Sequence, residues 1–324
     1  MIYYIGDSHT AGISHSNPIK EKYEYNPYPH YLSNLLNSEY INLGIPGSNL
    51  VNNIQIFIDN LQSIIDNGKM VIELPKTLRE EFEGTIRCIF QPGEERLPGG
   101  ASIMIREGVL KNPNVESIIG QHVMPLMDAG KVGFRPGLYM ASADEIYIRV
   151  IGKGGHGAHP HQNIDPVMIA AQIITQLQTI PSRRAKPSIP TVLSIGKVIA
   201  EGSTNIIPNE VYMEGTFRTY DEEWRAKAHQ LIVQMCNDIC KLHGATCEAE
   251  VRKGYPFLMN DEKLTENAKQ WATEYLGAEN VLDLELWPAG EDFAYYSQEI
   301  PACFYRLGSK NEAQGKTSMV HTPT

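Results

Sequence analysis

Two adjacent carboxylates, Glu94 and Glu95, stand directly after a strand-like run and before a glycine-rich turn. The run, residues 84–90 (GTIRCIF), is apolar and β-branched, which is typical of a strand buried on both faces of a parallel sheet. Open α/β sheets bind ligands at the carboxyl ends of such strands. Neighbouring carboxylates repel each other unless a cation or a shared proton offsets the repulsion. The pair therefore indicates a metal site with one carboxylate as general base, or else a solvated turn.

Two histidines extend the metal hypothesis. His122 ends a second strand-like run, residues 117–123 (SIIGQHV), and His321 lies in VHTPT near the end of the sequence. One carboxylate with two imidazoles is a ligand set suited to zinc, cobalt or manganese. Taken singly, each histidine is more often a structural or surface residue, so the hypothesis requires the three groups to converge.

Several longer segments carry a family resemblance. They are FQPGEERLPGGASIMIREGVL, GQHVMPLMDAGKVGFRPG, ASADEIYIRVIGKGGHGAHPH, NIIPNEVYMEGTFRT, EDFAYY and VHTPT. Together they resemble the metal-dependent amidohydrolases that include the N-acyl-amino-acid hydrolases (aminoacylases) and hippurate hydrolase, within the wider aminoacylase and carboxypeptidase metallopeptidase group. The resemblance runs from about residue 74 to residue 324.

This resemblance implies an enzyme that hydrolyses linear amides of N-acyl amino acids with two divalent ions, either zinc, manganese or cobalt. It implies that Glu94 is the general base and that three residues are metal ligands: Glu95, His122 and His321. His156, in GGHGAHPH, resembles an imidazole that a lid domain extends over the substrate to stabilise the oxyanion. Without the resemblance, His156 would be interpreted as a hydrogen-bonded loop histidine.

Three more residues are candidates for the site. By resemblance, Asn205 helps to hold the substrate. Arg218 ends a strand-like run and either pairs with a substrate carboxylate or is a surface arginine. Glu291, in PAGEDF, either orients a metal ligand or, with Asp292, caps the helix that follows.

The elements that must position these residues form an α/β protein. Residues 137–252 follow the order β-α-β-β-α-β, the ferredoxin-like split unit, which we interpret as an inserted α+β lid and dimerisation domain. Residues 71–136 and 253–324 then form a metallopeptidase-like α/β catalytic domain. Besides the strand-like runs 84–90 and 117–123, four helices and five further strands are predicted: helices 101–110, 165–180, 221–243 and 261–276, and strands 145–151, 191–200, 210–220, 247–252 and 279–286.

Residues 1–70 follow a different pattern. MIYYIGDSHTAG and INLGIPGSN resemble the first half of the flavodoxin-like SGNH (GDSL) esterases. That resemblance would make Ser8 a nucleophile and give Gly47 a backbone N–H in the oxyanion hole. The Asp-x-x-His and Gly-x-Asn-Asp blocks of those esterases are absent, so Ser8 is equally well a polar residue that caps a turn.

The amidohydrolase pattern also lacks its upstream Gly-Cys-Gly-His-Asp-x-His stretch, because no cysteine precedes Cys88. We therefore expect weak metal binding and impaired activity. Three functional hypotheses follow: a metal-dependent amidohydrolase, a serine esterase that uses Ser8, and a catalytically inactive fusion product.

Bulk composition favours a globular protein with a small-molecule substrate. The chain has 324 residues, 42% of them hydrophobic, and a net charge of -10. This charge argues against nucleic acid or an anionic membrane as a partner. The five cysteines form no metal-ligand spacing, and their odd number argues against a disulfide framework. No signal peptide or long apolar run is evident, so we expect a cytoplasmic protein, and the resemblance suggests a homodimer through the lid.

Overall fold

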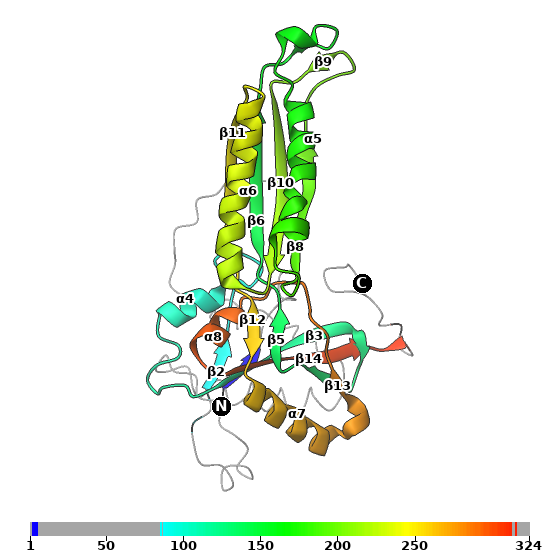
Figure 1. Ribbon diagram of the computed structural model, residues 1–324. Helices are drawn as coiled ribbons and strands as arrows, with labels where there is room; N and C mark the ends of the chain where they lie inside the picture. Colours follow the sequence, from blue (N-terminus) through cyan, green and yellow to red (C-terminus); the bar gives the residue numbers. More distant parts are fainter. Residues whose placement is uncertain (1, 6–84, 86, 313–314, 316–324) are drawn as a thin grey trace, which may run out of the picture.

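The computed structural model describes residues 2–5, 85, 87–312 and 315 (Figure 1). Ser8, Gly47 and His321, which the sequence singles out, lie outside these ranges. The described strands are β1 (Ile2–Ile5), β2 (Arg87–Phe90), β3 (Ile118–Asp128), β4 (Val132–Phe134), β5 (Gly137–Met140), β6 (Asp144–Ile151), β7 (Gly155–His156), β8 (Thr191–Ile199), β9 (Ile206–Ile207), β10 (Glu210–Thr219), β11 (Thr246–Arg252), β12 (Leu258–Asn260), β13 (Val281–Asp283) and β14 (Ala302–Lys310). The described α-helices are α4 (Gly100–Arg106), α5 (Pro166–Leu177), α6 (Glu222–Leu242), α7 (Glu262–Leu276) and α8 (Ala294–Glu299). Shorter helical turns are η2 (Pro160–Gln162), η3 (Ile180–Arg184) and η4 (Ala278–Asn280).

A six-stranded sheet with the order β13-β4-β14-β3-β1-β2 carries the loops of interest. Strands β1, β2, β3 and β14 run parallel, whereas β4 is antiparallel to β14. Strand β1 lies between β2 and β3, so the first described residues belong to the same sheet as β2, which precedes Glu94, and β3, which contains His122. Because parallel strands end at the same edge, the residues after β2 and those late in β3 are brought to one side of the sheet.

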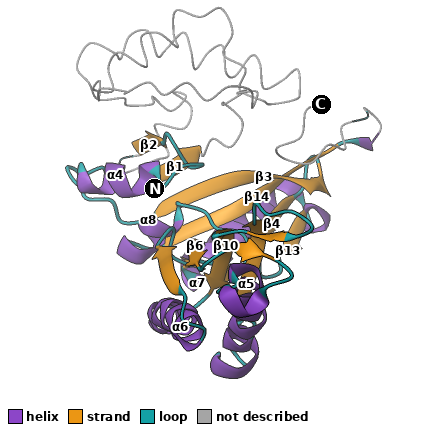
Figure 2. Cartoon of the chain, turned by 90° about the horizontal axis from the view of Figure 1, so that it is seen from above, coloured by secondary structure: helices purple, strands orange, loops and turns teal. Residues whose placement is uncertain are grey.

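Helices cover both faces of this sheet (Figures 1 and 2). One face packs Ile118 and Phe304 with Phe293, Tyr296 and their neighbours around α4 and α8. The other face packs against α7, where apolar residues recur at helical spacing. Gly120 is required on the first face, because a Cβ there would lie 2.6 Å from the Phe293 ring.

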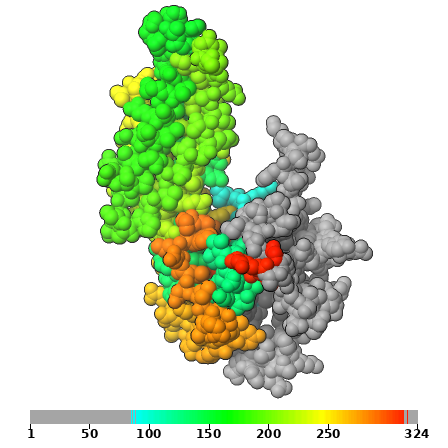
Figure 3. Space-filling view, turned by 90° about the vertical axis from the view of Figure 1, so that its right-hand side faces the viewer, coloured from blue at the N-terminus to red at the C-terminus, as the bar shows by residue number. Residues whose placement is uncertain are grey.

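A second, four-stranded antiparallel sheet has the order β11-β6-β10-β8, with α5 and α6 packed on one face. It stands as a column above the first sheet (Figures 1 and 3). Strand β6 alternates buried and more exposed residues, as expected for a sheet with one solvated face. The element order β6-α5-β8-β10-α6-β11 is the one that the sequence predicts for residues 137–252. Its role as a lid stays a prediction.

Aspartates begin the three long helices. The carboxylates of Asp165, Asp221 and Asp261 each accept hydrogen bonds from backbone N–H groups of the first helical turn. The predicted helices therefore begin where the sequence places them, although α5 ends at Leu177 and a π-turn follows. The strand predicted for residues 279–286 is shortened to β13, because η4 occupies its first residues. No helix in the described part of the chain combines the length and apolar composition needed to cross a membrane.

Asp144 joins the two sheets through a buried polar network. Its carboxylate pairs with the Arg225 guanidinium, and both side chains are at most 1% exposed. It also accepts hydrogen bonds from His229 Nε2 at 2.7 Å and from the Gly254 backbone N–H at 2.9 Å. Asp144 begins β6, where the chain enters the second sheet, and Gly254 follows β11, where the chain leaves it. The Asp144 carboxylate therefore binds together the two segments that connect the second sheet to the first. Burial alone raises the pKa of Asp144, but hydrogen bonds from Arg225 and His229 and the Arg225 charge outweigh it and hold the pKa below its usual value.

Replacement of Arg225 by Met should lower the free energy of unfolding by about 3–5 kcal/mol, because it leaves the Asp144 carboxylate buried beside only His229 and Gly254. In the unmodified protein the contribution of Asp144 should be present above pH ~4, the unfolded-state pKa, and should be lost as the pH falls through the lower folded-state pKa. Urea unfolding followed by tryptophan fluorescence measures both effects.

Arg149→Met, which removes an exposed ion pair with Glu210, is the matched control and should lower the free energy of unfolding by less than ~1 kcal/mol. Equal losses in the two variants would contradict this account of the network.

Candidate active site

Glu94 and Glu95 lie in the turn between β2 and α4, at the carboxyl edge of the six-stranded sheet. The predicted strand, glycine turn and helix are confirmed in kind, since β2 ends at Phe90 and α4 begins at Gly100. The Glu94 side chain is half-buried, whereas the Glu95 side chain is exposed. The two carboxylates are therefore placed at the ligand-binding edge that the sequence predicts.

Contacts from distant segments fix the conformation of this turn. The Tyr255 hydroxyl donates to the backbone carbonyl of Glu94. The Asp292 carboxylate accepts hydrogen bonds from Gln91 Nε2 and, at 3.0 Å, from the Ala101 backbone N–H at the start of α4. Gly99 has a φ of +83°, and a Cβ on it would lie 2.5 Å from Asp292 Oδ2. The turn is thus positioned by residues that come more than 150 positions later in the chain.

A cavity of about 200 Å³ opens beside the turn. Its wall contains Glu94 and Glu95 from the turn, His122 from β3, Glu291 from the segment before α8, and Arg306 from β14. The remaining lining residues are mostly apolar: Val123, Met124, Pro125, Leu126, Met140, Trp287, Ala289 and Gly290. The structure therefore brings together four of the residues that the sequence predicts for the site.

Several carboxyl groups lie close together in the wall of this cavity. Burial, together with Asp292 and Glu95, raises the pKa of Glu94 to about 7, while Arg306 opposes the shift. Burial, with Glu94 and Asp292, also raises the pKa of Glu291, which is 3% exposed. A carboxyl whose pKa lies near 7 exchanges its proton readily at neutral pH, which is the property required of a general base.

His122 faces the same cavity in a defined tautomer. Its Nδ1 lies 2.7 Å from the Val123 carbonyl oxygen. Because a carbonyl only accepts hydrogen bonds, Nδ1 carries the proton, and in the neutral ring Nε2 carries the lone pair. A second hydrogen bond of this kind is how metal-binding histidines are usually oriented.

The chemistry of these residues fits a divalent cation. Carboxyl groups whose pKa is raised by burial and by neighbouring carboxylates would be stabilised in their charged form by a cation, and a neutral imidazole is a common partner ligand. Within residues 87–312, however, no three histidine, cysteine or acidic side chains come close enough to form a complete ligand set. The described part of the chain thus supplies a partial set, and the predicted ligand His321 lies outside it.

Two predicted site residues lie elsewhere. His156 pairs with Ile206 in the small β7-β9 ribbon, and Asn205 accepts a hydrogen bond there from the Gly157 backbone N–H. This ribbon is at the end of the column remote from the six-stranded sheet (Figure 1). Neither residue lines the cavity. Their functional roles stay predictions.

Arg218 lies close to the cavity wall but does not line it. Its Nη1 is 3.4 Å from the Pro288 carbonyl oxygen, next to the segment 289–291 that does. Burial lowers the pKa of Arg218. Its predicted contact with substrate stays a prediction.

The two residues of the acidic pair before α8 have different contacts, and the predicted role of Glu291 beside a metal ligand stays a prediction. Glu291 lines the cavity, and its carboxylate also lies 3.3 Å from the Phe293 backbone N–H. Asp292, in contrast, caps α4 rather than α8, a long-range contact that no local pattern indicates. Arg306 was missed altogether, because a lone arginine within a strand-like run gives no sequence signal.

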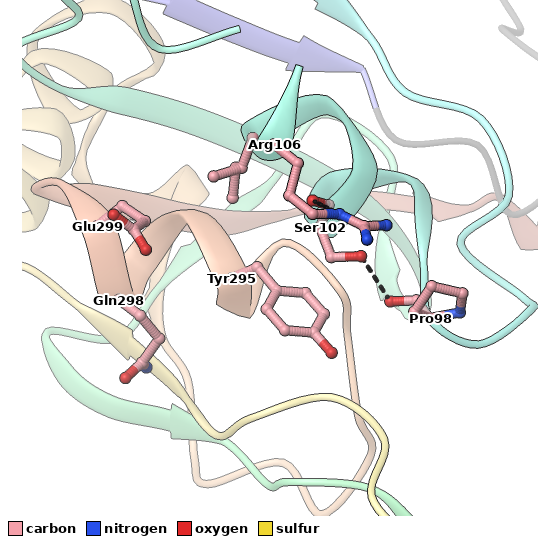
Figure 4. A pocket seen from close by; sticks show the side chains of 7 residues that line it. Pro98, Ser102, Arg106, Tyr295, Gln298 and Glu299 are labelled. Atoms are coloured by element: carbon pink, nitrogen blue, oxygen red, sulfur yellow. Dashed lines mark hydrogen bonds between the residues drawn. The ribbon is translucent and has the colours of Figure 1, made fainter. Parts of the chain in front are cut away.

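A second cavity, of about 400 Å³, lies between α4 and α8 (Figure 4). Its lining residues are Pro98, Ser102, Ile105, Arg106, Tyr295, Gln298 and Glu299. The Ser102 hydroxyl donates to the Pro98 carbonyl at 3.1 Å within its wall. None of the predicted site residues lines this cavity.

Comparison with known proteins assigns the family. The model of Peptidase family M20/M25/M40 matches residues 68–324. The chain belongs to this family. The match begins close to the boundary that the sequence predicts near residue 70, and none of the findings supports the SGNH-like segment 1–70 or its alternative nucleophile Ser8.

Three relatives of this chain, two enzymes and one crystal structure, illustrate the similarity. An N-acyl-L-amino acid amidohydrolase of Geobacillus stearothermophilus is 42% identical over 186 residues, which are 57% of this chain and 50% of the relative. An N-acetyl-L-cysteine deacetylase of Bacillus subtilis (strain 168) is 35% identical over 239 residues, 74% of this chain and 56% of the relative. The crystal structure of the YXEP protein of Bacillus subtilis, described as a dinuclear metal-binding peptidase of the M20 family, is 32% identical with a TM-score of 0.60 and covers 76% of this chain and 60% of its own.

This M20 chain spans about half to three fifths of the length of these relatives. These comparisons establish an α/β fold with mixed sheets. They also establish that the chain belongs to a hydrolase family that includes amidohydrolases. The predicted amidohydrolase family is confirmed at that level.

The close packing at Gly99 can be tested against Gly93, because the two glycines flank the carboxylates and both have positive φ. An alanine at either position adopts a strained backbone, but only at Gly99 does its Cβ also meet Asp292. We expect Gly99→Ala to lower the free energy of unfolding by at least ~1 kcal/mol more than Gly93→Ala, which has no neighbour within 4 Å. Urea unfolding of both variants measures the difference, and equal stabilities would contradict the packing.

Proposed function

We propose that this protein hydrolyses the amide bond of N-acyl amino acids, releasing a carboxylic acid and a free amino acid. The proposal rests on one observation above all: Glu94, with a pKa of about 7, lines the same small cavity as His122 and Glu291. A cavity of about 200 Å³ is below the ~300–1,000 Å³ typical of drug-sized ligands and suits a small substrate. The relatives described as an N-acyl-L-amino acid amidohydrolase and an N-acetyl-L-cysteine deacetylase support this substrate class.

In the proposed mechanism Glu94 acts as general base and then as general acid. Its carboxylate takes a proton from water as the water oxygen bonds to the acyl carbon. Glu94 then gives that proton to the amide nitrogen as the carbon–nitrogen bond breaks, so the amine leaves neutral. The contacts of Tyr255 and Asp292 keep the turn of Glu94 in place throughout these steps.

Glu95 and His122 are the described residues that would hold a divalent cation, with Glu291 oriented beside them. When bound, the cation would polarise the acyl carbonyl and stabilise the negative charge that develops on its oxygen. The Val123 carbonyl keeps His122 in the tautomer that such binding requires. Zinc, manganese and cobalt all suit this donor set.

His156 is proposed to donate to the oxyanion, although it lies at the remote end of the column in this chain. A side chain so placed reaches the cavity of its own chain only through a large movement. A second copy can supply it instead, which agrees with the proposed homodimer through the lid.

Replacement of Glu94 by Gln should reduce the turnover of N-acetyl amino acids by about 10²- to 10⁴-fold, because an amide of the same shape cannot accept the proton. Turnover is measured by release of the free amino acid, and bound metal is measured by plasma mass spectrometry. Glu248→Gln, on the exposed edge strand β11, is the control and should keep full activity. Undiminished turnover in the Glu94 variant, at unchanged metal content, would refute the mechanism.

Mixing two inactive variants tests the origin of the histidine. Glu94→Gln and His156→Ala should each be nearly inactive alone, because each lacks one of the two groups. If the histidine comes from a second copy, a refolded mixture should regain up to about a quarter of the unmodified activity, since half of its molecules are mixed dimers with one intact site. The absence of any recovery, with dimers present by gel filtration, would rule out the second-copy arrangement.

A further inference from the structure

Arg306 is a buried cation in the wall of the cavity. It lies on β14, is 5% exposed, and stands opposite His122 in the register between β14 and β3. Three aromatic rings surround its guanidinium, with centroids 5.4 Å (Phe304), 5.8 Å (Tyr139) and 6.0 Å (Trp287) from Cζ. The rings account for its position but neutralise none of its charge.

The hydrogen bonds of Arg306 are few and go to neutral atoms. Nε donates to the Tyr139 hydroxyl at 2.9 Å, and Nη2 lies 3.3 Å from the Met140 sulfur. No carboxylate within residues 87–312 lies within ion-pair distance of it. A guanidinium has five N–H donors, and buried arginines are normally paired with an anion. The side chain therefore faces the cavity with donor capacity that the described residues do not use.

The rest of the cavity explains why such a cation is needed. Every other charged side chain in the described wall is a carboxylate: Glu94, Glu95 and Glu291. A substrate with a free carboxylate would be repelled by this wall unless a fixed cation faces it. Arginine suits that task better than lysine, because its planar fork binds both oxygens of a carboxylate.

We propose that Arg306 is the specificity-determining residue of this site and binds the carboxylate of the N-acyl amino acid. The assignment rests on the proposed function. It places the carboxylate beside the Trp287 ring and the scissile amide toward Glu94. Arg218, the carboxylate partner that the sequence suggests, is instead directed at the Pro288 carbonyl and does not line the cavity.

Fluorescence titration of the full chain tests the assignment, because a ligand at Arg306 lies against Trp287. The probes are N-acetylmethionine and its primary amide, which differ only in the charged group. The unmodified protein should bind the acid at least 10-fold more tightly than the amide. Arg306→Met should lose at least 10-fold in affinity for the acid and less than 3-fold for the amide, while Arg306→Lys should lie between the two proteins.

Two controls accompany the titration. Arg149→Met removes an exposed arginine of β6 and should leave both affinities unchanged. Trp287→Phe should abolish most of the fluorescence change on titration, which verifies that Trp287 is its source. If Arg306→Met does not fold, as judged by its thermal unfolding, Arg306→Lys decides the matter through the same acid-to-amide ratio.

An unmodified protein that does not prefer the acid would overturn the proposal, as would a substitution that weakens acid and amide equally. An equal loss of affinity for both ligands would mean that Arg306 affects binding only through the charge of Glu94 and does not bind the carboxylate. Because binding is measured apart from turnover, the two proposals fail separately. An acid preference that depends on Arg306 in a protein without turnover would refute the proposed function alone, and turnover with no dependence on Arg306 would refute the specificity assignment alone.

Discussion

Mutual repulsion among buried carboxyl groups is the constraint on which the rest of this site depends. Burial raises the pKa of both Glu94 and Glu291, and the charge of Asp292 raises both further. Such crowding costs free energy and persists only where surrounding contacts enforce it. Here those contacts are hydrogen bonds. The Asp292 carboxylate accepts them from Gln91 and from the start of α4, and the Tyr255 hydroxyl donates one to the Glu94 carbonyl.

The second sheet is joined to this edge by rigid contacts rather than by a loose linker. Asp144 and Gly254 lie at the two chain crossings, and Gly254 packs so closely that a Cβ there would lie 2.0 Å from the Ala143 carbonyl oxygen. Tyr255, which follows directly, is the residue that contacts the Glu94 turn. The position of the column is therefore coupled to the position of Glu94, the proposed general base, through two consecutive residues.

Local patterns were sufficient to predict strands β2, β6, β8, β10 and β11, the starts of the three long helices and the turn of Glu94, but not strand β14. Asp165 and Asp221 cap their helices because capping depends on a few neighbouring residues, which the sequence displays directly. The contact of Asp292 with α4 and the burial of Arg306 were not predicted, since both arise only when segments about 170 to 190 residues apart pack together. For the same reason the sequence grouped His156 with Glu94, whereas the folded chain separates them along the column.

Charge balance links the catalytic and recognition properties of the cavity. An acidic wall favours a bound cation and disfavours an anionic substrate, so one site can accept both only if the positive charges have different positions. Arg306 provides a fixed positive charge on the strand beside His122. Three aromatic rings surround its guanidinium without neutralising its charge. In the proposed assignment, this fixed cation lets a cavity that is otherwise lined by carboxylates select a negatively charged substrate.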